Sequence, residues 1–297
     1  MKQTCSAWLL DLYPDSEVGV KLWFLRADGE LVCLAHALPV TFYASGTNEQ
    51  LRALWRFLRR HPLVTQLART KRRDLFSGSI TVLSVTAPTP TAQRRLFYAA
   101  RAAFPHLTWY DADVPLPLRY TAHYGVFPLA RCQITFEGET LLSLESRASP
   151  WEHDPKLPPL RVLSLSPDAD PAHQTPRFLH ITCDKRTYRL ALDPPRPLLI
   201  SLTATLRSYN PDLILAEWGD TWLLPHLLKL SEQWNIPLPL NRDPLLEVEH
   251  RKELSYHAYG QIVYRGQSTF LFGRWHVDPR NAMMFGEYVR NPGYGDQ

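Results

Sequence analysis

The chain has 297 residues, a formal net charge of +4 and 45% hydrophobic residues, as expected for a folded protein of one large or two smaller domains. No apolar stretch is long enough to span a bilayer, and the N-terminus lacks the apolar core and cleavage site of a signal peptide. We therefore expect a cytoplasmic protein with no membrane partner. The four cysteines have no CxxC spacing, which argues against a zinc site or a disulfide framework.

The first 150 residues alternate between strand and helix patterns. A hairpin turn is predicted at Asp28-Gly29 and a second one at Gly138, because strand-like runs flank both. A helix is expected after Asn48, which can serve as its N-cap, and it should end at Pro62. The remaining expected elements of this half are strands over residues 8–14, 79–88 and 107–115, and a helix over 91–105.

Positive charge is concentrated in residues 51–73, which contain eight Lys or Arg and no acid, so the rest of the chain is net negative. Leu51, Leu54, Trp55 and Leu58 recur at helical spacing and predict a buried face, with Trp55 in the core rather than stacking on bases. The alternative is a solvated helix face followed by a loop. We favour phosphate contact because the bias is so one-sided. The residues expected to bind DNA are Arg52, Arg56, Arg59, Arg60, Arg69, Lys71, Arg72 and Arg73.

Residues 148–160 are Pro-rich and without periodicity, and they predict a linker between domains at about 1–150 and 151–297. Beyond the linker, three strand patterns precede a helix, and a further strand and helix follow. This order predicts an α/β layer with a mixed sheet. The expected strands cover residues 161–168, 177–184, 187–193 and 212–218, and the expected helices cover 198–210 and 221–235.

Several segments come in the order known from one enzyme family. LRVLSLSPD, NPDLILAEWGDTWLLPHLL and GRWHVD resemble the 3′→5′ exonuclease region of family B DNA polymerases, and WYDADVPLPLRY resembles the end of the N-terminal domain before it. The match is closest to a lineage whose catalytic motifs are degraded. The resemblance implies an α/β fold in which a mixed-sheet N-terminal domain is followed by a ribonuclease H-like, exonuclease-type domain that is truncated here.

The resemblance also locates the former catalytic positions. Family members use carboxylates to hold two metal ions for hydrolysis of DNA. Here Ser166 and Asp168 stand at the first two of these positions, Trp218 replaces an Asn, and Leu223 replaces the metal-binding Asp of the second motif. The third motif is absent before Gln297. We therefore expect no catalytic residue and no metal or other cofactor.

The polar residues around these positions are given structural roles. Glu217 and Asp220 are interpreted as solvated turn residues, and Asp220 or Thr221 as the cap of the following helix. Asp278 is expected to pair with Arg274 or Arg280. The bulky side chains Trp218, Trp222, His226 and His276 are expected to be packed.

Together these patterns predict an inactive module that holds primer-template or single-stranded DNA in replication or repair, or supports a separate polymerase-like C-terminal half. Motifs resembling those of a polymerase palm are absent. The alternative is an active exonuclease that binds Mg²⁺ or Mn²⁺ through Asp168, Glu217, Asp220 or Asp278. A third possibility, a structural protein that binds only protein, would be favoured if the basic stretch were buried or paired.

Overall fold

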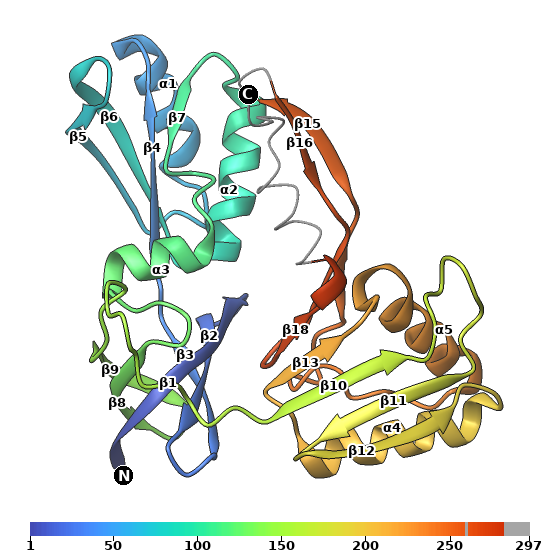
Figure 1. The fold of residues 1–297 in the computed structure, drawn as a ribbon. Helices are drawn as coiled ribbons and strands as arrows, with labels where there is room; N and C mark the ends of the chain where they lie inside the picture. Colours follow the sequence, from blue (N-terminus) through green and yellow to red (C-terminus); the bar gives the residue numbers. More distant parts are fainter. Residues whose placement is uncertain (259–260, 282–297) are drawn as a thin grey trace, which may run out of the picture. The chain divides into compact units, whose positions relative to one another are not determined.

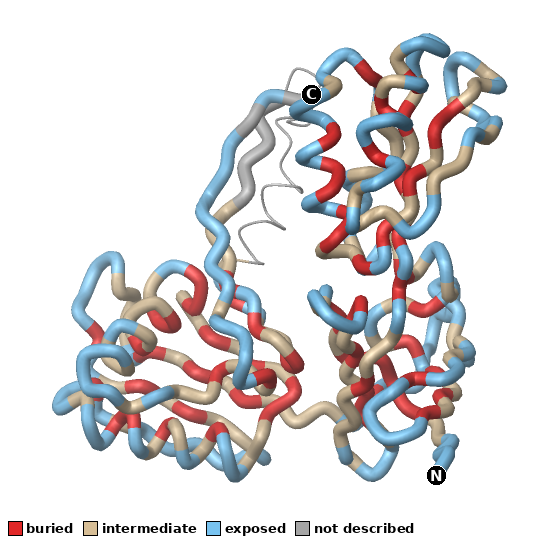
Figure 2. Tube along the Cα trace, turned by 180° about the vertical axis from the view of Figure 1, so that it is seen from behind, coloured by how far each residue is buried: buried red, intermediate tan, exposed pale blue. Residues whose placement is uncertain are grey.

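A computed structural model of the chain describes residues 1–258 and 261–281. The chain divides into two compact units, Met1–Pro158 and Pro159–Gln297, and the division falls within the Pro-rich segment 148–160. Buried residues gather inside each unit (Figure 2), and the units are described separately. None of the described helices has the length and apolar character needed to cross a membrane. The expected truncation concerns the tail at 282–297, outside the described residues.

A closed five-stranded barrel forms one part of the first unit (Figure 1), in the order β1-β2-β3-β9-β8. Its neighbouring strands are antiparallel except β3 and β9, which are parallel. Leu9 and Phe24 fill its core with Tyr120 from helix α3, whose hydroxyl lies 2.8 Å from Nδ1 of His36. Burial in this core raises the pKa of the Cys132 thiol to about 12. The elements are β1 (Lys2–Asp15), β2 (Gly19–Arg26), β3 (Leu31–His36), β8 (Arg131–Glu137), β9 (Thr140–Ser146) and α3 (Leu116–Tyr124).

Between β3 and α3 the chain forms a second layer with the order of elements βαββαβ. Its four strands pair as β5-β6-β4-β7, the arrangement of a ferredoxin-like fold. Leu54 of α1 and Leu96 of α2 share one core with Phe42 and Leu83, so both helices cover the same face of the sheet. The elements are β4 (Val40–Ser45), α1 (Asn48–Leu58), β5 (Gln66–Asp74), β6 (Gly78–Ala87), α2 (Pro90–Ala103) and β7 (Thr108–Tyr110).

The first unit differs from the sequence predictions at several points. Strand β4 was not predicted, α1 ends at Leu58 rather than at Pro62, and the strand expected over 107–115 is only the short β7. The N-cap of α1 is Thr47 rather than Asn48, and Thr47 forms a capping box with Gln50. The second half of the basic stretch is strand β5 rather than a loop. Helix α3 was not predicted, because its prolines look irregular, although proline is tolerated in a first helical turn. Both predicted hairpins are confirmed.

The second unit is built on a five-stranded mixed sheet in the order β12-β11-β10-β13-β18. Strands β10, β11 and β12 form an antiparallel meander, while β10, β13 and β18 run parallel. The predicted mixed sheet is therefore confirmed, and Leu163, Leu165 and Ile214 supply its core face. The strands are β10 (Val162–Pro167), β11 (Phe178–Cys183), β12 (Arg186–Ala191), β13 (Leu213–Ala216) and β18 (Trp275–Val277).

Two helices pack into the same core as this sheet. Leu202 and Leu206 of α4 and Leu224 and Leu227 of α5 are fully or almost fully buried there. A π-helical turn, η1, lies between β13 and α5, and two small strand pairs precede β18. These elements are α4 (Pro195–Tyr209), η1 (Gly219–Leu223), α5 (Leu224–Trp234), β14 (Glu249–Arg251) paired with β17 (Ser268–Phe270), and β15 (Leu254–Ala258) paired with β16 (Gln261–Arg265).

Candidate nucleic-acid interface

The basic stretch runs from helix α1 of the first unit through the turn after it, which carries Arg59 and Arg60, to strand β5. The two elements meet where the guanidinium of Arg69 donates a hydrogen bond of 2.6 Å to Oδ1 of Asn48, at the start of α1. On α1 the leucines Leu51, Leu54 and Leu58 face the core, which leaves the arginines on the outer side. The helix half and the strand half of the stretch thus belong to one α/β layer, and below we call them the basic surface.

All eight cations of the basic surface are exposed. Within residues 1–258 and 261–281, none of them forms an ion pair with a carboxylate. Exposed cations without acidic partners are free to meet phosphate groups. The condition that would have favoured a purely structural role, burial or pairing of this stretch, is therefore not met.

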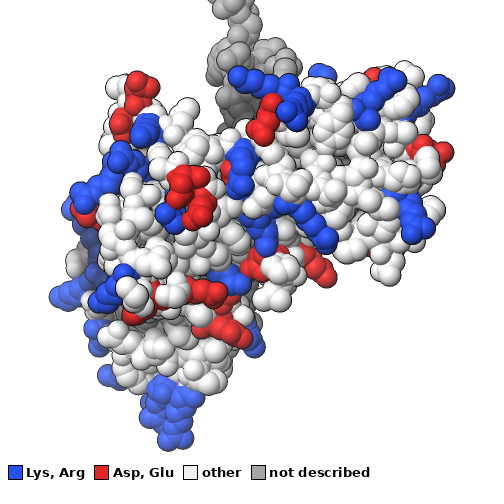
Figure 3. All heavy atoms as spheres, turned by 90° about the horizontal axis from the view of Figure 1, so that it is seen from below, with Lys and Arg blue, Asp and Glu red and all other residues white. Residues whose placement is uncertain are grey.

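The charge on the basic surface is a local feature. On the face drawn in Figure 3, Lys and Arg are interspersed with Asp and Glu over both units.

The predicted core position of Trp55 is wrong, because 38% of this residue is exposed, and Phe57 beside it is 43% exposed. Phe57 packs edge-on against Phe104, with ring centroids 5.5 Å apart. Aromatic rings therefore lie among the arginines of α1.

The turn between β13 and α5 carries Trp218 and Leu223, two of the positions that the sequence predicts to belong to a degraded metal site. Trp218 begins it with a left-handed backbone conformation (φ 51°), and η1 follows without a side-chain cap. The predicted capping by Asp220 or Thr221 is therefore wrong. The Arg280 guanidinium lies 4.8 Å from the centre of the Trp218 ring, and its Nη2 lies 3.4 Å from Oε2 of Glu217. Glu217 is accordingly a partly buried, paired residue.

Asp220 is buried rather than solvated, with 7% of the residue exposed. Its Oδ1 accepts a hydrogen bond of 2.7 Å from the backbone N–H of Thr269, and its Oδ2 accepts one of 2.7 Å from the Asn281 amide. His276 is packed as predicted: its Nδ1 lies 3.1 Å from the Thr269 carbonyl, and burial holds its pKa below the usual value. These contacts give Asp220 a structural role, joining η1 to β17 and to the segment after β18.

Asp278 is the carboxylate that the structure brings next to Asp220. Its Oδ2 accepts a hydrogen bond of 3.2 Å from the backbone N–H of Asp220, and its Oδ1 accepts one of 3.0 Å from that of Arg280. The expected ion pair with Arg274 or Arg280 is thus replaced by backbone contacts. In the part of the chain that the structure describes, no three His, Cys, Asp or Glu side chains are grouped so as to hold a metal ion.

Three further positions are expected, from the sequence, to belong to a degraded catalytic site: Ser166, Asp168 and Leu223. Ser166 is on β10, and Asp168 follows that strand as an exposed residue. Slight burial opposes ionisation of Asp168, but the N–H groups of Phe178 and Arg177 outweigh it and hold the pKa of Asp168 below its usual value. Leu223 is completely buried in the core of the unit. Its side chain offers no ligand, and no solvent reaches it.

Trp222 of η1 and His226 of α5 form a second small feature. Trp222 and His226 stack with ring centroids 5.0 Å apart and planes at 10°. Burial, followed by the nearby charge of Lys229, holds the pKa of His226 below its usual value. Both residues are partly buried, and Trp222 packs against the core of the unit, as predicted.

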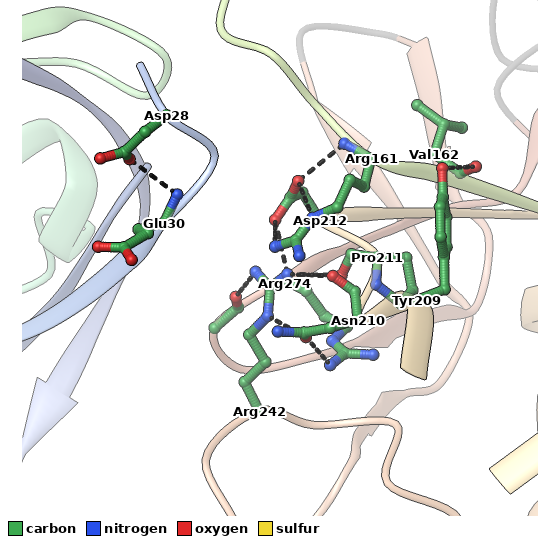
Figure 4. Close-up of polar contacts among 11 residues, drawn as sticks. Asp28, Glu30, Arg161, Val162, Tyr209, Asn210, Pro211, Asp212, Arg242 and Arg274 are labelled. Atoms are coloured by element: carbon green, nitrogen blue, oxygen red, sulfur yellow. Dashed lines mark hydrogen bonds and ion pairs between the residues drawn. The ribbon is translucent and has the colours of Figure 1, made fainter. Parts of the chain in front are cut away.

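A buried charge cluster that the sequence did not reveal lies at the start of β13 (Figure 4). Asp212 has no exposed side-chain surface and pairs with Arg161 at 3.2 Å and with Arg242 at 2.6 Å. Burial opposes ionisation of Asp212, but the hydrogen bonds from Arg161 and the charge of Arg242 outweigh it and lower its pKa. Arg274, 3% exposed, donates to Oδ1 of Asn210 at 3.0 Å, and burial lowers its pKa to about 9. The cluster ties the end of α4 to the segments before β14 and β18.

Comparison with known proteins points to one class of enzyme. No protein-family model matches the chain. A segment of 83 residues, 28% of this chain, is 30% identical to a DNA polymerase of the archaeon Archaeoglobus fulgidus, of which it covers 9%. The solved structure of the family B DNA polymerase of Pyrobaculum calidifontis matches 92% of this chain with a TM-score of 0.61 at 21% identity.

This chain spans only part of those polymerases, since it covers 36% of the Pyrobaculum protein. At that identity the likeness concerns the fold. The structural match nevertheless covers 92% of this chain and therefore includes residues of both units. The chain is thus similar in fold, over most of its length, to a part of a family B DNA polymerase.

Proposed function

We propose that the chain is a non-catalytic DNA-binding module related to the N-terminal and exonuclease regions of family B DNA polymerases, with a role in replication or repair. The observation that carries this function is the basic surface: eight exposed cations on α1, on the turn directly after it and on β5, without acidic partners among the described residues. Phosphate contacts of this kind give affinity that does not depend on DNA sequence. The likeness to DNA polymerases supports DNA as the polyanion.

The second unit is proposed to be a ribonuclease H-like domain with an inactive exonuclease site. Its mixed sheet, an antiparallel meander joined to two parallel strands, supports this fold. Inactivity is supported by the side chains at the former metal positions. Leu223 is buried among apolar neighbours, and both carboxylate oxygens of Asp220 already accept protein hydrogen bonds. Two-metal hydrolysis needs several free carboxylates around the scissile phosphate.

The proposed partners are primer-template or single-stranded DNA and a separate polymerase-like C-terminal half. No cofactor is required for binding of this kind. Mg²⁺ or Mn²⁺ would matter only if the carboxylates Asp168, Glu217, Asp220 and Asp278 acted as a rearranged nuclease site.

The first test is to incubate the full chain with end-labelled primer-template DNA, with and without Mn²⁺, on native and denaturing gels. A shifted band with intact DNA is expected. Metal-dependent shortening of the strand that Asp168→Ala abolishes would instead show an active nuclease.

The second part of the test assigns the contact surface. Arg59→Ala/Arg60→Ala should weaken DNA binding and reduce the salt slope by about 2, because each lost phosphate contact contributes about one unit. Arg186→Ala/Arg207→Ala removes two exposed arginines of the second unit and serves as the matched control. Equal binding by both double variants would remove Arg59 and Arg60, which lie in the turn after α1, from the interface.

A further inference from the structure

The face of the β5-β6-β4-β7 sheet that points away from α1 and α2 carries two tyrosines. Phe42 and Ala44 of β4 are buried under the helices, so Tyr43 between them points to the opposite face. Tyr110 of β7 is the direct strand partner of Tyr43 and lies on the same face. Two aromatic rings are therefore neighbours on the side of the sheet that neither helix covers.

These tyrosines line a cavity of about 410 Å³, together with Ile80 and Val82 of β6. Its size falls within the range of small-molecule pockets. The cavity exists because the β5–β6 hairpin continues past β4, whose pairing with β6 ends at Ala44. Below we call this cavity the hairpin pocket.

The charged residues around the hairpin pocket favour a base over a phosphate group as its ligand. Arg72 contributes to its wall, with its guanidinium 5.1 Å from the centre of the Tyr43 ring and Nη2 3.1 Å from the Tyr43 hydroxyl. Asp74 and Asp111 also line it. The N–H groups of Ser77 and Phe76 lower the pKa of Asp74, which is therefore ionised at neutral pH. Carboxylates repel phosphate but accept hydrogen bonds from the amino groups of bases.

The tip of the same hairpin is unusually apolar for a surface turn. Leu75 is 88% exposed and Phe76 is 93% exposed, and only Asp74 separates them from Arg72 and Arg73. An exposed aromatic ring next to cations is the combination that binds single strands, since bases stack on the ring while phosphates contact the cations. The tip and the pocket thus offer stacking surfaces on one basic hairpin.

We propose that the hairpin pocket binds an unpaired base of single-stranded DNA. The base stacks on Tyr43 or Tyr110, the phosphates contact the cations of β5, and a neighbouring base rests on Phe76. This inference rests on the proposed DNA-binding function and adds to it a preference for single strands. Bases within a duplex are stacked and paired, so they do not enter a pocket of this kind.

The test measures binding of the full chain to labelled oligonucleotides of about 16 nucleotides. Three DNA probes are compared: a mixed-sequence single strand, the same strand with abasic sites, and the duplex. Tyr43→Leu and Tyr110→Leu should each weaken binding of the intact single strand about 5- to 150-fold, the range of one base-stacking contact. Their salt slopes should stay unchanged, because the phosphate contacts remain.

Two further variants serve as an independent test of base stacking and as a control. Phe76→Ser changes only the exposed tip, so it reports on stacking even if Tyr43→Leu fails to fold. Tyr98→Leu removes a tyrosine of α2 that is 55% exposed and lies outside the pocket, and it should bind like the wild type.

The outcomes separate the pocket from the wider function. Salt-dependent DNA binding that neither the tyrosine variants, Phe76→Ser nor abasic sites weaken would overturn the pocket and leave the basic surface intact. Absence of binding to any probe would overturn both. Tighter binding of an RNA strand of the same sequence would overturn the assignment to DNA.

Discussion

Asp212 is the residue on which the order of the second unit's charge cluster depends. Its carboxylate is inaccessible to solvent and pairs with both Arg161 and Arg242, and Arg242 also donates to the backbone carbonyls of Asn210 and Pro211. Removing a buried charge leaves its partners uncompensated, which costs far more than losing an exposed pair.

Asp212→Asn should therefore lower the free energy of unfolding by about 3–5 kcal/mol, measured by chemical denaturation at neutral pH. The control is Asp28→Asn, which removes a half-exposed carboxylate that pairs with Arg26 at 2.8 Å. That change should cost at most about 1 kcal/mol. Equal losses in the two variants would contradict a special role of the buried pair.

The same variant predicts a pH dependence. The folded pKa of Asp212 is lower than its unfolded value of about 3.9, so the unfolded chain binds the proton more tightly. The stabilisation is complete above that unfolded value and is lost as the pH falls through the folded pKa. The difference in stability between wild type and Asp212→Asn should accordingly shrink below about pH 4.

At this scale the sequence predicted some roles and missed others. The apolar character of Leu223 was evident, and its burial follows from its place in an amphipathic run. Asp220 was misjudged because a polar residue in a turn is usually solvated, whereas its partners Thr269 and Asn281 lie far along the chain. Tyr43 gave a usable signal, since alternation with Phe42 and Ala44 places it on the opposite face of a strand.

Among the elements, η1 depends on a close approach of two segments. Gly219 lies against the His276 ring, and a Cβ at Gly219 would overlap Nε2 of His276 and come within 2.8 Å of the Ala216 Cβ. The absence of a side chain at Gly219 is what allows β18 to pass this turn.

Gly219→Ala should destabilise the chain by about 1–3 kcal/mol, the usual cost of overpacking. In a His276→Ala background the same substitution should cost clearly less, because the overlapping ring is gone. Thermal or chemical denaturation of the four chains in this cycle provides the measurement. A cost independent of His276 would show that the contact is not what limits the turn.

The prediction of secondary structure was wrong where the local sequence pattern did not indicate the strand pairing that the structure has. Strand β5 was not among the predicted elements, because its arginines hide any alternation, yet it pairs with β6 along its whole length. As the edge strand of its sheet it also benefits from cations, which discourage pairing with another chain. The error at Asn48 was smaller, because Thr47 and Asn48 are both good caps and only geometry selects between them.

For the whole molecule, the two units have separate cores joined by an extended segment. Trp8 of the barrel donates a hydrogen bond of 2.9 Å to the carbonyl of Lys156, which fixes the end of the segment to the first unit. Lys156 itself is exposed. The Pro-rich composition predicts a linker in this segment, whereas the closed barrel required strand pairings that no local pattern specifies.

Brief digestion with trypsin should first cut the chain within residues 147–156 and leave two fragments of similar size. Exposed backbone without regular hydrogen bonding is the preferred target of proteases. Mass spectrometry of the fragments, and their cooperative unfolding by circular dichroism, provide the measurement. Arg147→Gln/Lys156→Gln should delay this cut, and early cleavage inside a sheet would contradict two independently stable units.

The buried Cys132 thiol can report how often the barrel of the first unit opens. Cys132 is fully buried, and its raised pKa leaves almost no thiolate at neutral pH. An alkylating reagent therefore modifies Cys132 only during moments when the barrel is open. In a chain whose other cysteines are replaced by serine, the rate of Cys132 alkylation measures how often the barrel opens. Comparing this rate with and without bound single-stranded DNA shows whether DNA binding changes the opening.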